Sequence, residues 1–166
     1  MRRERNGSMA IELAMWLPFM FLLIGGIVQF GKITYIYYSL QKTMTAVANY
    51  LAVQNGVNFC LGASDPAIAA AIQFGITGTT DGSGTPAITD LSADMITITT
   101  QCLDPVTLTL GDCSVAGCDT PVGAQRPDFI TVSMPGGYIV QPRIPYLLVD
   151  PIPLKPQAVM AYGGGS

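Results

Sequence analysis

The amino-acid sequence predicts an α+β fold. We expect a long N-terminal helix, transmembrane in its first half, packed on a small antiparallel β-sheet head with a short second helix. Residues 13–31 carry no charge and reach about 28 Å as a helix, close to the thickness of a bilayer core. Residues 95–162 instead contain short segments rich in β-branched residues, separated by glycine- and proline-rich turns.

The length of 166 residues allows one domain with an appendage. We expect a basic leader over residues 1–7, a long helix over 8–56 and an extracytoplasmic head over 57–166. Within the helix, residues 13–32 would span the membrane and residues 33–55 would form an amphipathic rear half.

Charged residues make up only 11% of the chain and hydrophobic residues 49%. Residues 60–166 hold nine Asp but only three basic residues, so they offer no basic patch for nucleic acid. Histidine is absent, which removes the commonest general base and metal ligand. We therefore expect no enzyme activity, no cofactor and no metal.

Three arginines, Arg2, Arg3 and Arg5, precede the apolar run and predict a cytoplasmic N-terminus. The head and its cysteines then lie outside the cytoplasm. An ordinary secretory signal peptide is the alternative, but its apolar core is shorter and ends at a small-residue cleavage site. The apolar helix is therefore expected to stay attached.

A glycine followed five residues later by a glutamate opens the apolar run. Gly7, Ser8 and Glu12 in this arrangement resemble the type IV prepilin processing signal. The resemblance implies cleavage between Gly7 and Ser8 by a prepilin peptidase, and pairing of Glu12 with the new N-terminal amine of a neighbouring subunit. A carboxylate at an apolar boundary is costly without a partner. The alternative is that Glu12 simply lies at the headgroup level of a membrane anchor.

The longer stretch RNGSMAIELAMWLP, residues 5–18, resembles the opening of the TadE family, and GIVQFG at 26–31 continues the match. Asn6 and Gln29 depart from the family pattern. The resemblance implies a pilin-like minor pilin or pseudopilin of a Tad (type IV-like) pilus or related secretion filament. It also implies other pilins and the inner-membrane secretion platform as partners. The expected location is the bacterial inner membrane with the head in the periplasm, or the assembled pilus outside the cell.

Pro18 interrupts the apolar helix, because proline lacks a backbone N–H and displaces the carbonyl of Ala14. Membrane helices tolerate such a kink. With Gly25, Gly26 and Gly31 thinning one side, it would let neighbouring helices pack closely. We therefore assign Pro18, with Glu12, to assembly.

The rear half of the helix carries one apolar stripe and is expected to end near Asn55-Gly56. Its spacing is nearly heptad, so a short coiled coil is the alternative. Tyr35, Tyr37 and Tyr38 are typical of a membrane-interface belt. The stripe consists of Ile33, Tyr37, Leu40, Met44, Val47 and Leu51.

In the head, Ser64, Asp65 and Pro66 predict the start of a short helix that ends at Gly75. Seven prolines between Pro127 and Pro156 favour edge strands or extended linkers there. Strands are expected at residues 95–100, 106–110, 129–134 and 157–162.

All four cysteines follow the apolar run, which favours disulfides in an oxidising compartment. A zinc site is the alternative, but only Cys113 and Cys118 are close neighbours. Among the three possible connectivities we prefer Cys113–Cys118 with Cys60–Cys102, because the second bridge would tie the helix to the sheet.

Asp104, Asp112 and Asp119 lie near the cysteines but lack the alternate spacing of a calcium loop. Asx-turn hydrogen bonds explain aspartates in such turns sufficiently. The predicted function is thus structural assembly. The alternative is an unprocessed, membrane-anchored extracytoplasmic binding or adhesion module.

Overall fold

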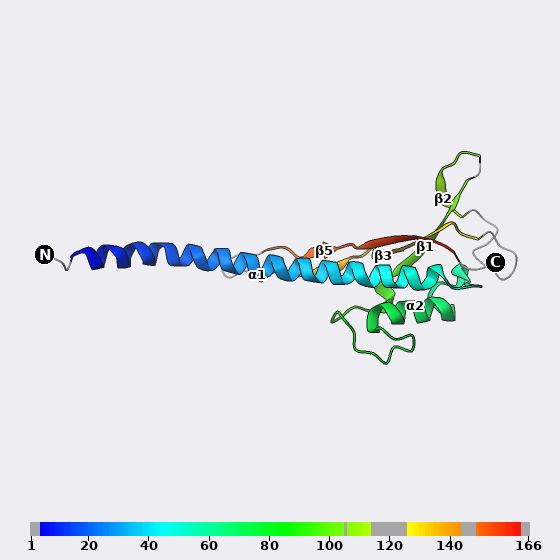
Figure 1. The fold of residues 1–166 in the computed structure, drawn as a ribbon, viewed down its shortest axis with the longest axis horizontal. Coiled ribbons are helices and arrows are strands. Elements are labelled where there is room, and N and C mark those ends of the chain that lie inside the picture. Colours follow the sequence, from blue (N-terminus) through cyan, green and yellow to red (C-terminus); the bar gives the residue numbers. More distant parts are fainter. Residues whose placement is uncertain (1–3, 105, 114–125, 144–148, 164–166) are drawn as a thin grey trace. The chain divides into compact units, whose positions relative to one another are not determined.

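The computed structural model describes residues 4–104, 106–113, 126–143 and 149–163. It confirms the predicted α+β fold, with a long N-terminal helix, a short second helix and an antiparallel sheet. The elements in chain order (Figure 1) are α1 (Glu4–Ala52), η1 (Phe59–Ser64), α2 (Pro66–Thr77), η2 (Ala93–Met95), β1 (Thr97–Leu103), β2 (Leu110–Asp112), β3 (Phe129–Ser133), β4 (Tyr138–Val140), β5 (Ile152–Leu154) and β6 (Gln157–Ala161).

The chain divides into two compact units. One comprises Met1–Ile36 with Ile139–Ile152, and the other comprises Tyr37–Tyr138 with Pro153–Ser166. Helix α1 contributes its first part to the former unit and its rear part to the latter. The two parts of α1 therefore have different surroundings.

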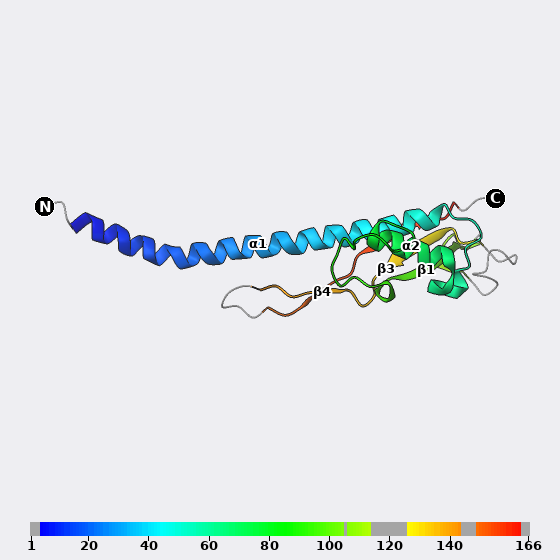
Figure 2. The same ribbon diagram turned by 90° about the horizontal axis from the view of Figure 1, so that it is seen from below.

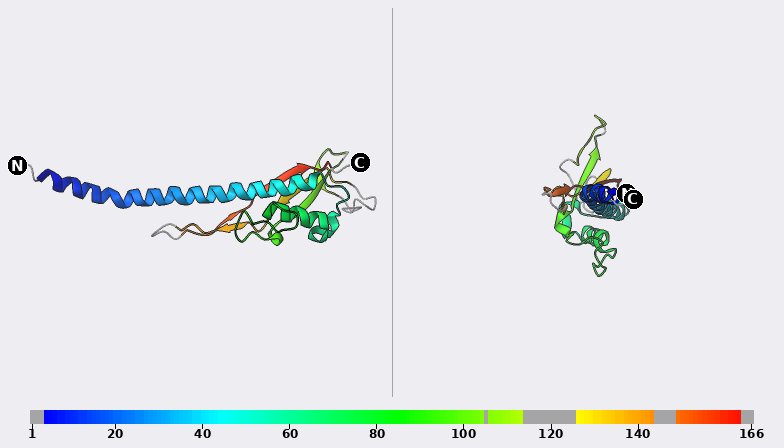
Figure 3. Two further views of the ribbon diagram at one scale, coloured as in Figure 1. Left: turned by 60° about the horizontal axis from the view of Figure 1, so that its bottom comes forward. Right: turned by 90° about the vertical axis from the view of Figure 1, so that its left-hand side faces the viewer.

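The rear part of α1 forms the centre of the second unit's core, because its apolar stripe is covered by the head. Four residues of the predicted stripe, Leu40, Met44, Val47 and Leu51, are fully buried, whereas Ile33 is half-buried and Tyr37 is 45% exposed. Figure 3 shows α2 and the strands β1, β3 and β6 alongside this cyan part of α1. The short coiled coil is not needed to explain the spacing, since the chain itself covers these side chains.

Helix α1 ends at Ala52, about one turn before the predicted stop signal. The residues that follow β6 explain the difference, because Gly163 donates its N–H to the Ala52 carbonyl oxygen at 2.9 Å. The Tyr162 hydroxyl donates to the Gln54 carbonyl oxygen at 2.8 Å. These bonds satisfy carbonyls that a helix end otherwise leaves unpaired. Burial raises the pKa of the Tyr162 phenol.

Helix α2 begins as predicted, with Asp65 as N-cap and Pro66 in the first turn. The Asp65 carboxylate accepts from the backbone N–H groups of Ala67 at 2.8 Å and of Asn58 at 3.0 Å. One buried side chain thus joins the start of α2 to the segment that follows α1.

The predicted end of α2 at Gly75 is wrong, because the helix continues to Thr77 and is capped by Gly78 in the left-handed conformation. Gly75 instead serves close packing. A Cβ placed there would lie 2.3 Å from the Val47 side chain of α1. The aromatic rings of Tyr50 and Phe74 contact each other nearby, with centroids 5.5 Å apart.

The main sheet has the strand order β2-β1-β3-β6, with all neighbours antiparallel. Strand β3 lies between β1 and β6, and its Thr131 pairs with Thr99 on one side and Val159 on the other. Ile130 and Val132 of β3 are fully buried. The predicted strands at 95–100, 129–134 and 157–162 correspond to β1, β3 and β6.

The predicted strand at 106–110 is wrong, since only Leu110 belongs to a strand. Leu108 adopts a left-handed φ of 54°. Asp104 Oδ1 accepts from the N–H of Val106 at 2.7 Å and from that of Thr107 at 3.2 Å. This Asx turn takes precedence over the alternating apolar pattern.

The proline-rich segment forms two short strands, β4 and β5, in a separate two-stranded sheet. Each has three residues, in keeping with the expectation that prolines prevent a long central strand. Gly137, just before β4, has a φ of 71° and closes the turn that enters the sheet.

Candidate functional site: the N-terminal helix

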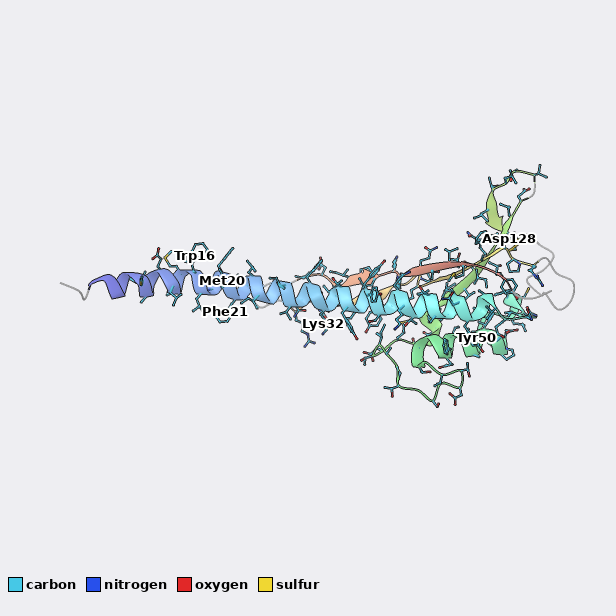
Figure 4. The ribbon with its side chains drawn as sticks, viewed as in Figure 1. Trp16, Met20, Phe21, Lys32, Tyr50 and Asp128 are labelled. Carbon is cyan, nitrogen blue, oxygen red and sulfur yellow. A yellow bond between two sulfur atoms is a disulfide. The ribbon has the colours of Figure 1, made fainter. Side chains whose placement is uncertain are left out.

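The first part of α1 is an apolar surface that the described chain leaves uncovered. This helix is long and apolar enough, by length and composition, to cross a membrane. Trp16, Phe21 and Phe30 are 58%, 67% and 73% exposed. In Figure 4, Trp16, Met20 and Phe21 project away from the helix axis. An apolar surface of this extent is normally covered by lipid or by other helices.

The predicted processing residues lie in the first turns of α1. The helix begins at Glu4 and runs without a break through Gly7, Ser8 and Glu12. Ser8 and Glu12 are one turn apart, about 6 Å along the axis. The Glu12 side chain is exposed, and no partner for it is recorded among the described residues. Processing at Gly7 and Ser8, and a role for Glu12, remain predictions.

Pro18 lies inside α1, which continues through it as a helix. Figure 2 shows that α1 is curved along its blue N-terminal part. Among the described residues, nothing lies within 4 Å of a Cβ added at Gly25, Gly26 or Gly31. The packing of the described residues therefore does not require glycine at these positions. The assembly role of Pro18 remains a prediction.

Gln29 joins α1 to a segment far along the chain. Its side-chain Nε2 donates to the Arg143 carbonyl oxygen at 2.8 Å, within the unit that contains residues 1–36 and 139–152. Thr34, one turn further on, donates its hydroxyl to the Phe30 carbonyl oxygen at 2.9 Å. The threonine thus satisfies its polar group within the helix, whereas the glutamine uses a distant partner.

Sequence reasoning missed the role of Gln29 and treated it only as a departure from the family pattern. A signal was present, because an amide inside an uncharged apolar run calls for a hydrogen-bond partner. The partner itself had no signal, since it is a backbone carbonyl 114 residues away.

The disulfide preference is wrong. Cys102 of β1 is bonded to Cys113, which follows β2, with Cα atoms 4.7 Å apart. The preferred Cys113–Cys118 and Cys60–Cys102 bridges are therefore excluded. The antiparallel pairing of Cys102 with Gly111 brings the two cysteines together, which the sequence alone did not reveal. Cys60 is also disulfide-bonded, and Cys118 lies outside the described residues.

The aspartates near the cysteines form turns. Hydrogen bonds from the backbone N–H groups of Val106 and Thr107 lower the pKa of the Asp104 carboxyl. Asp112 lies in β2, and Asp119 lies outside the described residues. Among the described residues, no group of three or more His, Cys, Asp or Glu side chains is arranged to hold a metal ion.

A shallow depression lies on the polar side of the rear half of α1. Its charged group is a lysine, accompanied by amides and hydroxyl groups, which do not form a nucleophile–base pair. The lining residues are Tyr38, Gln41, Lys42, Thr45, Ala46 and Asn49.

Comparison with known proteins identifies the N-terminal helix. The family model described as TadE-like protein matches residues 7–49. These residues include Gly7, the apolar run and most of the rear half of α1, so the predicted TadE-like resemblance is confirmed there. No curated protein and no solved structure gives a significant match.

Proposed function

On the premise that its N-terminal helix is TadE-like, we propose that this chain is a minor pilin or pseudopilin. It is a structural subunit that takes part in assembling a Tad (type IV-like) pilus or a related secretion filament. It is not an enzyme. The observation that carries the proposal is the TadE-like match over residues 7–49, on a helix whose first part is apolar and uncovered.

The two parts of α1 support this function in different ways. The first part is suited to lipid before assembly and to neighbouring helices afterwards, because both environments are apolar. The rear part, from Leu40 to Leu51, is already covered by the head. The same helix can therefore leave the membrane without exposing the core of the head.

Processing would precede assembly. Cleavage between Gly7 and Ser8 requires the peptidase to unwind the start of α1, because the helix begins at Glu4. The cost is small, since helix ends fray and only one turn lies before the bond. Cleavage removes the basic leader and creates an amine at Ser8. In the filament, Glu12 of one subunit pairs with the amine of its neighbour, which offsets the cost of a carboxylate in apolar surroundings.

The first test is the intact mass of the protein from its native membrane, measured with and without reductant and alkylation. The expected species begins at Ser8, with N-methylation allowed for, and has no free thiol. A chain that retains Met1 to Gly7 beside an active prepilin peptidase would contradict the processing step.

The second test is the Glu12→Ala variant, which we expect to be inserted and processed but not assembled. Glu4→Ala is the matched control, because the chain has only two glutamates and Glu4 lies in the leader that cleavage removes. Filament yield is compared at equal membrane content. Normal assembly of the Glu12 variant would exclude the proposed pairing.

An unprocessed binding or adhesion module is the second candidate. The turn between β1 and β2 favours it, because Val106 and Leu108 are 87% and 73% exposed and offer apolar contacts to a partner. The mass measurement distinguishes the candidates, since the binding module keeps residues 1–7.

A further inference from the structure

The hydrogen bond between Gln29 and the Arg143 carbonyl fixes the level along the apolar helix at which residue 143 lies. Gln29 is two residues before the end of the uncharged run at Gly31, about 3 Å along the axis. Arg143 therefore lies at the level where the apolar run ends and Lys32 begins the polar part of α1. If the run spans a bilayer, this level is the lipid headgroup region.

The segment from Ile139 to Arg143 has one covered and one open side. Val140 and Pro142 are buried, whereas Ile139, Gln141 and Arg143 are exposed. The covered side and the bond from Gln29 hold the backbone in place. The open side carries the positively charged side chain of Arg143, which is exposed. The bond from Gln29 of α1 is accepted by the backbone carbonyl of Arg143 and does not involve this side chain.

The charges at this level favour an anionic surface. Lys32 and Arg143 are both exposed. In the part of this unit that follows the apolar run in sequence, the charged residues are Lys32, Arg143 and Asp150, which leaves a small positive excess there. Tyr35 is 72% exposed and lies one turn beyond Gly31. Tyrosines are enriched at membrane–water interfaces. Lysine, arginine and tyrosine within about one helical turn are suited to phospholipid phosphates and carbonyls.

We propose that the segment from Ile139 to Arg143 lies on the membrane surface, with Arg143 and Lys32 at the depth of the phospholipid phosphates and Gln29 holding the segment there. The inference rests on the membrane anchorage in the proposed function. It adds a second lipid contact, formed by the segment from Ile139 to Arg143, which the subunit must release when α1 leaves the membrane.

Trp16 is the only tryptophan in the chain, which permits a depth measurement. The full chain is placed in nanodiscs that contain anionic lipid, with or without lipids brominated close to the headgroup. Fluorescence quenching of the native Trp16 reports the depth of the membrane-spanning part of α1. A tryptophan introduced by Gln141→Trp in a Trp16→Phe background reports the depth of the segment from Ile139 to Arg143. Ser83→Trp in the same background reports the depth of a polar loop of the other unit.

We expect bromine to quench Trp16 and the tryptophan at position 141 to a similar extent, and to leave the tryptophan at position 83 unquenched. Gln29→Leu should reduce quenching at position 141 and leave Trp16 unchanged, because it removes only the donor. A tryptophan that enters the bilayer by its own affinity would be insensitive to this variant, and that result would overturn the inference.

Arg143→Gln keeps the backbone acceptor and removes the charge. Quenching at position 141 should then lose its dependence on anionic lipid, and a dependence equal to that of the native arginine would exclude the phosphate contact. If Trp16 is quenched but position 141 is not, the anchor stands and the inference fails. If neither is quenched, the proposed anchorage fails as well.

Discussion

Gly75 shows how a single residue sets the distance between two helices. Helix α2 approaches α1 so closely at this position that an added Cβ would meet the Val47 side chain at 2.3 Å and the Thr43 carbonyl oxygen at 3.3 Å. Val47 is fully buried. The glycine is therefore kept inside α2 in spite of its low helix propensity.

We predict that Gly75→Ala destabilises the head by about 1–3 kcal/mol, since overpacking a filled core forces side chains from their preferred rotamers. Denaturant unfolding of the purified protein measures the effect. Gly111→Ala is the matched control, because no described residue lies within 4 Å of a Cβ added there, and we expect a change within about 0.5 kcal/mol. Equal stability of the two variants would contradict the close approach of the helices.

Strands β1 and β2 show how an element at the edge of the sheet is stabilised. All three residues of β2 are exposed, so packing contributes little to its position. The Cys102–Cys113 bond closes the hairpin covalently instead. The turn at Asp104 adds local hydrogen bonds to its carboxylate. These bonds weaken in acid, because the carboxylate is protonated as the pH falls through its lowered pKa.

We predict that replacing Cys102 and Cys113 together by alanine releases β2 while β3 and β6 stay folded. Amide hydrogen exchange should become fast at Leu110–Asp112 and change little at Phe129–Ser133, because the latter strand is paired on both sides. A second variant in which Cys60 and Cys118 are replaced by alanine should contain no free thiol, because Cys102 and Cys113 remain bonded to each other. Detection of thiols at Cys102 and Cys113 in that variant would disprove their pairing.

Across the whole molecule, α1 serves two units with opposite requirements. Its first part is exposed and apolar, and its rear part supplies fully buried core residues from Leu40 onward. The fully buried residues of the head all lie beyond residue 36, so the head does not need the apolar run for its core.

We therefore predict that a chain of residues 33–166, exported to an oxidising compartment, is soluble and unfolds cooperatively. Circular dichroism on heating measures the transition, and the full chain in detergent is the reference. A fragment that lacks a cooperative transition would show that the first part of α1 is needed for the fold of the head.

The features that arise from neighbouring residues could be predicted from the amino-acid sequence. The uncharged run at 13–31, the stripe from Leu40 to Leu51 and the helix start at Asp65 follow from helical periodicity and capping, which act over a few residues. The TadE-like resemblance was likewise visible in the first residues of the chain. The predicted processing at Gly7 and Ser8 and the role of Glu12 await the experiments above.

The features that join distant residues could not be predicted from the sequence and became visible in the folded chain. The Cys102–Cys113 bond depends on the register of β1 with β2, and the end of α2 depends on where Gly75 meets α1. The partner of Gln29 lies 114 residues away. Such contacts are selected by packing and backbone pairing across the fold, and a local pattern of residue types does not contain that information.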